Sequence, residues 1–171
     1  MQLPGDAPSS DDIAAVTALI GRVPQGDFRI IVRSADGAPV VLLNAPLLSD
    51  GTPMPTLYWL VGEKEVHYVS QLEADGAVDQ VEELIGLEAI DAIHQRYMAT
   101  RDAMIPPSHT GHRPSGGVGG TRRGVKCLHA HFAHWLAGNE DAVGEWVAAQ
   151  LDARHQPRAE RRTAPESTEQ Q

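Results

Sequence analysis

The residues best suited to chemistry lie between Arg122 and Gly138, in the run RRGVKCLHAHFAHWLAG. This run contains the single cysteine of the chain, Cys127, and three histidines: His129, His131 and His134. A thiol, imidazoles and nearby cations are the groups used in nucleophilic catalysis, metal binding and anion binding. Which use applies depends on how the surrounding elements orient these side chains.

Helical spacing predicts one helix over residues 122–138, entered through a glycine-rich stretch and stopped by Gly138. Its core-facing stripe comprises Val125, Leu128, Phe132, Trp135 and Leu136. One flank of the stripe carries Cys127, His131 and His134, and the other carries Arg122, Lys126 and His129.

Cys127 is a candidate nucleophile in this arrangement. A helix N-terminus and the nearby cations Arg123 and Lys126 favour its thiolate form. With His129 or His131 as acid or base, the segment predicts an enzyme that acts on a phosphorylated or acidic small molecule. The structural alternative is that a lone cysteine beside a core stripe is a small buried hydrophobic side chain.

A metal site is less well supported. Zinc takes about four ligands in proteins, and His129 points away from the flank that carries Cys127. No acidic residue occurs between Ala103 and Asn139, so the segment offers no carboxylate as a further ligand. The sequence therefore predicts no metal ion and no other cofactor, with a three-ligand catalytic zinc site on the flank of Cys127, His131 and His134 as the alternative.

An anion site is the leading prediction. The stretch SGGVGGTRRGVK brings flexible backbone into a predicted helix N-terminus, where unpaired N–H groups and the helix dipole favour phosphate or carboxylate. The predicted ligands are Arg122, Arg123, Lys126 and His129. We therefore expect a binding or accessory protein with a small anionic ligand. The alternative is that this basic segment simply pairs with the acidic remainder of the fold.

A predicted helix over residues 87–104 aligns His94, Tyr97 and Arg101 at positions i, i+3 and i+7. These side chains form either a polar seam within the core or, with His134, a support for the site. The acidic run from Glu73 to Asp91 contains no lysine or arginine and is typical of a solvated face.

Composition limits the class of protein. The net charge of −9 argues against a general nucleic-acid binder or a binder of anionic membranes. No apolar run is long enough to span a membrane, and the first residues do not form a signal peptide, so we expect a cytoplasmic protein with no membrane insertion. A protein partner is compatible with this composition.

The element pattern predicts a single α+β domain over residues 9–155. It has a small, mostly antiparallel three-stranded sheet, with strands at 28–33, 39–44 and 56–61. About five helices cover it: 10–21, 66–86 in two pieces broken near Asp75-Gly76, 87–104, 122–138 and 140–153. Residues 1–8 and 156–171 are predicted to be a disordered lead and a disordered tail.

Four segments together resemble the bacterial domain-of-unknown-function 501 family, from about Val32 to Val143. They are DGTPMPTLYWL (50–60), SQLEADG (70–76), the pattern Tyr97…Arg101-Asp102, and RGVKCLHAHFAHWLAG (123–138). The resemblance implies no established activity. Genes of the family often lie near enolase and a septum-formation gene, which implies a cell-division context and, as a third function, a structural partner of the division machinery.

The chain departs from the family pattern at two cysteines. Members typically read C-P-x-G-x-P where this chain has Ser34 to Pro39, and Y-W-L-T-C-P where it has Tyr58 to Glu63. Ser34 and Gly62 therefore stand at the two cysteine positions. If the family binds a metal with three thiolates and a histidine, the resemblance implies that this chain has lost that site.

Overall fold

The computed structural model describes residues 3–163, and its sheet has three strands. They are β1 (Phe28–Arg33), β2 (Pro39–Asn44) and β3 (Tyr58–Leu60), paired antiparallel in the order β1-β2-β3. Branched apolar residues favour this extended backbone, and Gly37, at φ 86°, makes the left-handed turn between β1 and β2. The predicted antiparallel α+β architecture is confirmed.

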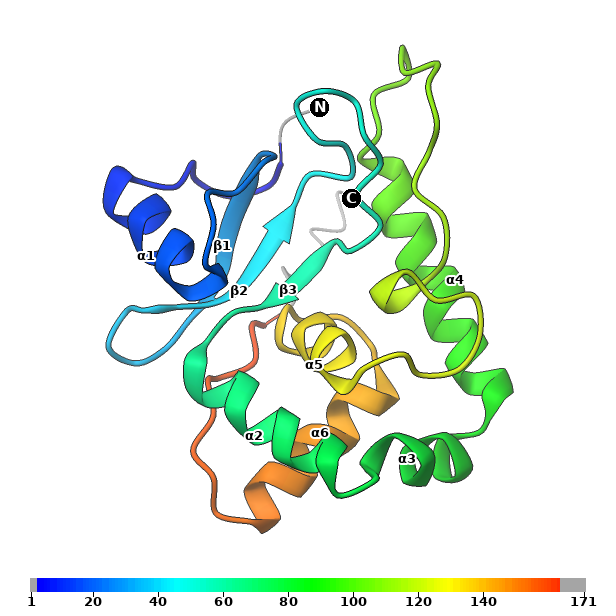
Figure 1. Ribbon diagram of the computed structural model, residues 1–171. Coiled ribbons are helices and arrows are strands. Elements are labelled where there is room, and N and C mark those ends of the chain that lie inside the picture. Colours follow the sequence, from blue (N-terminus) through cyan, green and yellow to red (C-terminus); the bar gives the residue numbers. More distant parts are fainter. Residues whose placement is uncertain (1–2, 164–171) are drawn as a thin grey trace, which may run out of the picture.

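Strand β2 is buried along its whole length because helices cover both faces of the sheet (Figure 1). Leu42 faces α1 (Ser10–Ile20) in a small core with Val16 and Phe28. Val41 and Leu43 face the main core, which contains α5 (Leu128–Leu136). Side chains that point to opposite faces of β2 therefore contribute to two separate cores.

Helix α5 lies at the centre of the other helices, and Figure 1 shows it nearly end-on. Around it are α2 (Glu63–Ala74), α3 (Ala77–Ile85), α4 (Leu87–Ala103), α6 (Ala142–Ala153) and a short 3₁₀ turn (Val118–Gly120). The break at Asp75-Gly76 separates α2 from α3, so the described chain has six α-helices where the sequence predicted about five.

The helix predicted over residues 122–138 begins later than expected, at Leu128. Gly124 adopts a left-handed backbone with φ 64°, and Cys127 is extended with φ −156°. Both conformations interrupt a right-handed helix. Arg122, Arg123 and Lys126 therefore lie in a loop before α5, and Cys127 is its N-cap residue.

Residues 156–163 lie against the domain, whereas their composition predicted disorder. Ala159 is buried, and its N–H donates to the Glu65 carboxylate at 2.9 Å. Arg161 donates to the carbonyl of Trp135 in the last turn of α5 and to those of Gly138 and Asn139 just beyond it, each at 3.0 Å. In the predicted lead, Leu3 is likewise buried in the main core. Residues 1–2 and 164–171 lie outside the described residues.

Across residues 3–163, no helix combines the length and the apolar character needed to cross a membrane.

Candidate functional site

Cys127, His129 and Glu73 meet where the N-terminus of α5 lies against the C-terminal half of α2. One ligand-type atom from each residue lies within 4.8 Å of the other two, and all three residues are half-buried. Glu73 Oε1 accepts a hydrogen bond from the Leu128 N–H at 2.6 Å and lies 3.2 Å from His129 Nδ1. The cluster is thus fixed from both helices and remains open to solvent.

Both ring nitrogens of His129 face hydrogen-bond acceptors. Nδ1 faces the Glu73 carboxylate, while Nε2 lies 3.2 Å from the Val66 carbonyl and 3.1 Å from Ser70 Oγ. The Ser70 hydroxyl already donates to the Val66 carbonyl at 2.8 Å, so its oxygen is available as an acceptor. This environment suits a doubly protonated imidazolium.

The pKa of His129 also favours the doubly protonated form. Burial lowers the pKa of His129, but its contacts with Cys127, Glu73 and the Val66 carbonyl outweigh burial and raise the pKa above its ordinary value. The raised pKa favours the cationic form of His129 beside the Cys127 thiol. An imidazolium next to a cysteine favours the thiolate, which is the nucleophilic form.

The first turn of α5 also offers unpaired backbone donors. Leu128 gives its N–H to Glu73, but the N–H groups of His129 and Ala130 have no acceptor among residues 3–163. Such groups, together with the positive end of the helix dipole, stabilise negative charge. They lie two and three residues after Cys127 in the chain.

The predicted anion ligands Arg122, Arg123 and Lys126 lie in a loop rather than in the first turns of a helix. Arg122 and Arg123 are exposed and form no ion pair with any described carboxylate, and Lys126 Nζ donates to the Gly119 carbonyl at 3.3 Å. The backbone donors expected to bind an anion are partly taken, because the N–H groups of Val125 and Leu128 bind Glu82 and Glu73. What remains is an exposed positive loop next to Cys127.

His131 and His134 do not join Cys127. Both are buried, and Nδ1 of each lies 2.9 Å from Asp141 Oδ2. The predicted flank of Cys127, His131 and His134 is therefore wrong: Cys127 precedes the helix, and the two histidines face the N-cap residue of α6. His131 Nε2 is buried without a hydrogen-bond partner among the described residues.

Polar side chains of α4 form a seam that hydrogen-bonds to backbone segments preceding the site in the sequence. The Tyr97 hydroxyl donates to the Pro55 carbonyl at 3.2 Å and accepts from the Leu57 N–H. The Arg101 guanidinium donates to the carbonyls of Gly116 and Pro114. His94 accepts from the Val118 N–H at Nδ1, and its Nε2 lies 2.9 Å from the Gly124 carbonyl. These side chains position the loop rather than contact Cys127.

The acidic run 73–91 supplied the residues that sequence reasoning missed. Glu73 and Glu82 were expected on a solvated face, but they cap the backbone of residues 125–128. The absence of acidic residues between Ala103 and Asn139 said nothing about carboxylates from another helix. Glu73, from α2, supplies a carboxylate that residues 103–139 do not contain. Together, Glu73, Cys127 and His129 form a set able to hold zinc.

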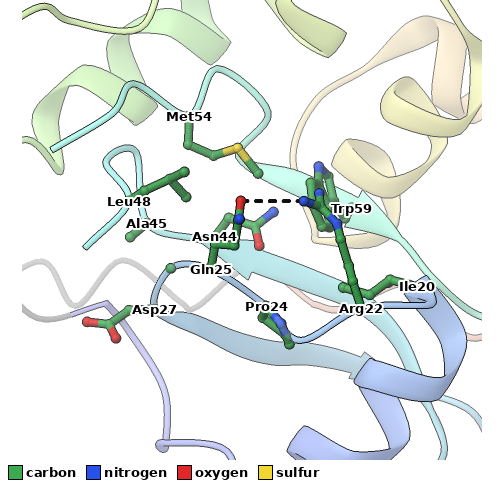
Figure 2. Close-up of a pocket in the computed structure, with 11 residues that line it drawn as sticks. Ile20, Arg22, Pro24, Gln25, Asp27, Asn44, Ala45, Leu48, Met54 and Trp59 are labelled. Carbon is green, nitrogen blue, oxygen red and sulfur yellow. Dashed lines mark hydrogen bonds between the residues drawn. The ribbon is translucent and has the colours of Figure 1, made fainter. Parts of the chain in front are cut away.

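A separate hollow of about 60 Å³ lies on the α1 side of the sheet (Figure 2). Arg22 stacks over the Trp59 ring, 5.8 Å from its centroid, and donates to Gln25 at 3.4 Å, the bond dashed in Figure 2. Asn44 and Met54 also line it. None of the predicted site residues lies in this hollow.

Comparison with known proteins identifies the family of the chain. The model of the family described as "Protein of unknown function (DUF501)" matches residues 30–149. The chain belongs to this family. Searches of curated proteins and of solved structures returned no match. The DUF501 resemblance seen in the sequence is therefore confirmed.

The fold also shows where the departures from the DUF501 pattern lie. Ser34 and Gly62 line one hollow between the β1–β2 turn and the start of α2. Cys127 does not line that hollow; it lies with Glu73 and His129. The three cysteine positions of the family pattern are thus divided between two places in this chain.

Proposed function

We propose that the protein is an enzyme that acts on a small acidic or phosphorylated molecule, with Cys127 as its nucleophile. The observation that carries the proposal is the cluster in which His129 lies beside both Glu73 and Cys127, with one ligand-type atom of each residue within 4.8 Å of the others. A nucleophile, an acid or base within reach, and a third group that orients the base are the elements of nucleophilic catalysis. His129 takes the acid or base role that the sequence offered to His129 or His131, and Glu73 is the group that orients it.

The reaction class follows from the donors next to the thiol. The unpaired N–H groups of His129 and Ala130 are suited to the oxyanion of a tetrahedral intermediate. We therefore assign acyl transfer, with an ester of the acidic molecule as the substrate class.

Substrate charge is the second element of the proposal. Arg122, Arg123 and Lys126 precede Cys127 on one exposed loop, and arginine binds carboxylate or phosphate through paired donors. In a chain of net charge −9, this loop is a local positive field. The predicted anion ligands thus become substrate-recognition residues.

The chemistry proceeds in two steps. The Cys127 thiolate attacks the ester carbonyl carbon to form a C–S bond, and the C–O bond breaks as His129 gives its proton to the leaving oxygen. Water then attacks the thioester and gives a proton to His129. The C–S bond breaks, the acid product leaves, and Cys127 returns as the thiolate beside the His129 imidazolium.

The test uses the mono-4-nitrophenyl ester of succinate as an anionic probe and 4-nitrophenyl acetate as a neutral one. We expect a burst of about one nitrophenolate per chain and a matching mass increase on the protein, both lost in Cys127→Ser. The burst is expected to be faster for the anionic probe, and Arg123→Glu/Lys126→Glu should remove that preference. Acylation that survives Cys127→Ser would overturn the proposal.

Two variants of α2 test whether the charge of Glu73, rather than the local structure of the helix, affects the burst. Glu73→Gln keeps an acceptor for the Leu128 N–H but removes the charge beside His129, and we expect a burst about tenfold slower. His67→Gln changes an exposed histidine of the same helix and should have no effect.

The same residues would serve a metal ion instead, and elemental analysis distinguishes the two. We expect no stoichiometric zinc in the purified protein. About one zinc per chain, lost in His129→Gln, would replace the nucleophile assignment with a metal site.

A further inference from the structure

A hollow of about 170 Å³ lies between the β1–β2 turn and the N-terminus of α2, away from the Cys127 cluster. Its apolar wall includes Leu19, Pro39 and Val40. Its polar side includes three carboxylates and one amine: Asp36, Glu63, Glu65 and Lys64. The proposed function does not use this hollow.

Glu65 is the unusual residue of the hollow because it is a carboxylate with only 5% of its surface exposed. Its Oε1 accepts the Ala159 N–H at 2.9 Å. Its Oε2 takes no hydrogen bond from any residue between 3 and 163. A buried carboxylate with one neutral donor remains poorly compensated, because removing its charge from water is costly.

Gly62 opens Glu65 to the hollow. A Cβ atom added at Gly62 would lie 2.5 Å from Glu65 Oε2 and 3.1 Å from a Val40 methyl carbon. The backbone of Gly62 has φ −58°, which any residue can adopt. The nearest atom is the end of the flexible Glu65 side chain, so a larger residue at position 62 would displace this carboxylate, whereas glycine leaves Oε2 accessible.

The charge of the hollow selects a cation. Three carboxylates and one lysine give a net charge of −2, and the N-terminus of α2 offsets only about half a unit of it. A metal ion fits poorly. In the described chain, the group of acidic, cysteine and histidine side chains close enough to share an ion is Glu73, Cys127 and His129, not these carboxylates.

We propose that this hollow binds a primary ammonium group carried on a short alkyl chain. The ammonium donates to Glu65 Oε2, and the alkyl chain lies against Leu19, Pro39 and Val40. An ammonium donates up to three hydrogen bonds and tolerates carboxylates that surround it without converging on one point. The ligand class is therefore a small aliphatic amine.

Calorimetric titration of the full chain tests this with n-butylammonium chloride, and with n-butanol, magnesium chloride and sodium chloride as comparison arms. We expect saturable heat from butylammonium alone. Glu65→Gln keeps an acceptor for the Ala159 N–H but removes the charge, and it should weaken binding about tenfold, as for loss of one charged hydrogen bond. Glu83→Gln, on an exposed face of α3, should leave the affinity unchanged.

Gly62→Ala gives a second test that keeps the charge of Glu65. Its methyl group would occupy the position next to Oε2, so we expect a loss of butylammonium affinity in a chain that still unfolds cooperatively. The proposal is overturned if both variants bind butylammonium like the original chain. It is also overturned if butanol or magnesium binds equally well, or if butylammonium gives no more heat than sodium chloride.

Discussion

Asp141 lies between two buried imidazoles and also begins a helix. Its Oδ2 is 2.9 Å from Nδ1 of both His131 and His134, and its Oδ1 accepts the Gly144 N–H of α6 at 2.9 Å. Burial raises the pKa of this carboxyl, but the hydrogen bonds and attraction of the two histidines outweigh burial and lower the pKa to about 2. Asp141 is therefore a carboxylate in the folded state.

Asp141→Asn is expected to lower the free energy of unfolding at pH 7 by about 3 kcal/mol, because it removes the charge that two buried histidines share. Asparagine keeps an oxygen for the Gly144 N–H, so the loss reports on the histidines. Chemical denaturation measures the change, with Glu145→Gln on the exposed face of α6 as control. Equal stability of the two variants would contradict this role.

The pH dependence has a definite sign. Because the folded-state pKa of Asp141 is below its ordinary value of 3.8, its stabilisation is present above about pH 4 and is lost as the pH falls towards 2. The amount lost is about 2 kcal/mol. Asp141→Asn should therefore show a smaller decrease in stability over this window than the original chain.

Helix α4 fixes the long loop that leads to the site. His94 holds Val118 and Gly124, while Arg101 holds Pro114 and Gly116. Burial lowers the pKa of His94, so its ring is neutral and carries its proton on Nε2, towards the Gly124 carbonyl. The exposed cations before Cys127 thus depend on two buried side chains of α4.

Arg101→Met should loosen this loop while leaving the helices formed. We expect trypsin to cleave after the exposed Arg122 and Arg123 about tenfold faster, because cleavage follows local opening of the loop. Arg96→Met, on the exposed face of α4, is the matched control, because Arg96 makes only a 3.5 Å contact with the Glu140 carbonyl. Equal cleavage rates in the two variants would show that Arg101 does not restrain the loop.

Elements with a strong local pattern were predictable from sequence. The strands at 28–33 and 39–44 have the predicted bounds, because alternating branched residues and the Asp36-Gly37 turn determine them locally. The start of α5 was not predictable, because Glu82 and Glu73, distant in sequence, take the N–H groups of Val125 and Leu128. The Cys127 cluster was half predicted for the same reason: Cys127 and His129 are neighbours in the chain, but Glu73 is not.

At the scale of the whole molecule, residues 156–163 connect α2 and α5. Arg158 and Arg161 lie 5.1 and 5.3 Å from the centre of the Trp135 ring, and Ala159 donates to the buried Glu65. Composition gave no sign of this, because the segment binds through backbone groups and cation–π contacts rather than large apolar side chains.

Ending the chain at His155 is expected to lower the free energy of unfolding by about 2–4 kcal/mol, through loss of the arginine contacts and of the donor to Glu65. A chain that ends at Thr163 keeps all of these contacts and is the matched control. Thermal and denaturant unfolding of both chains measure the difference. Identical midpoints would show that the segment contributes nothing to stability.

The measurement that tests the central claim most directly is the rate at which iodoacetamide alkylates Cys127. Because the chain has one cysteine, intact mass reports a single site. At pH 6.5 we expect alkylation about tenfold or more faster than that of glutathione, since the His129 imidazolium favours the thiolate, and a rate close to that of glutathione in His129→Gln. A rate in the original chain no faster than that of glutathione, or one unchanged by His129→Gln, would contradict the assignment of Cys127 as the nucleophile.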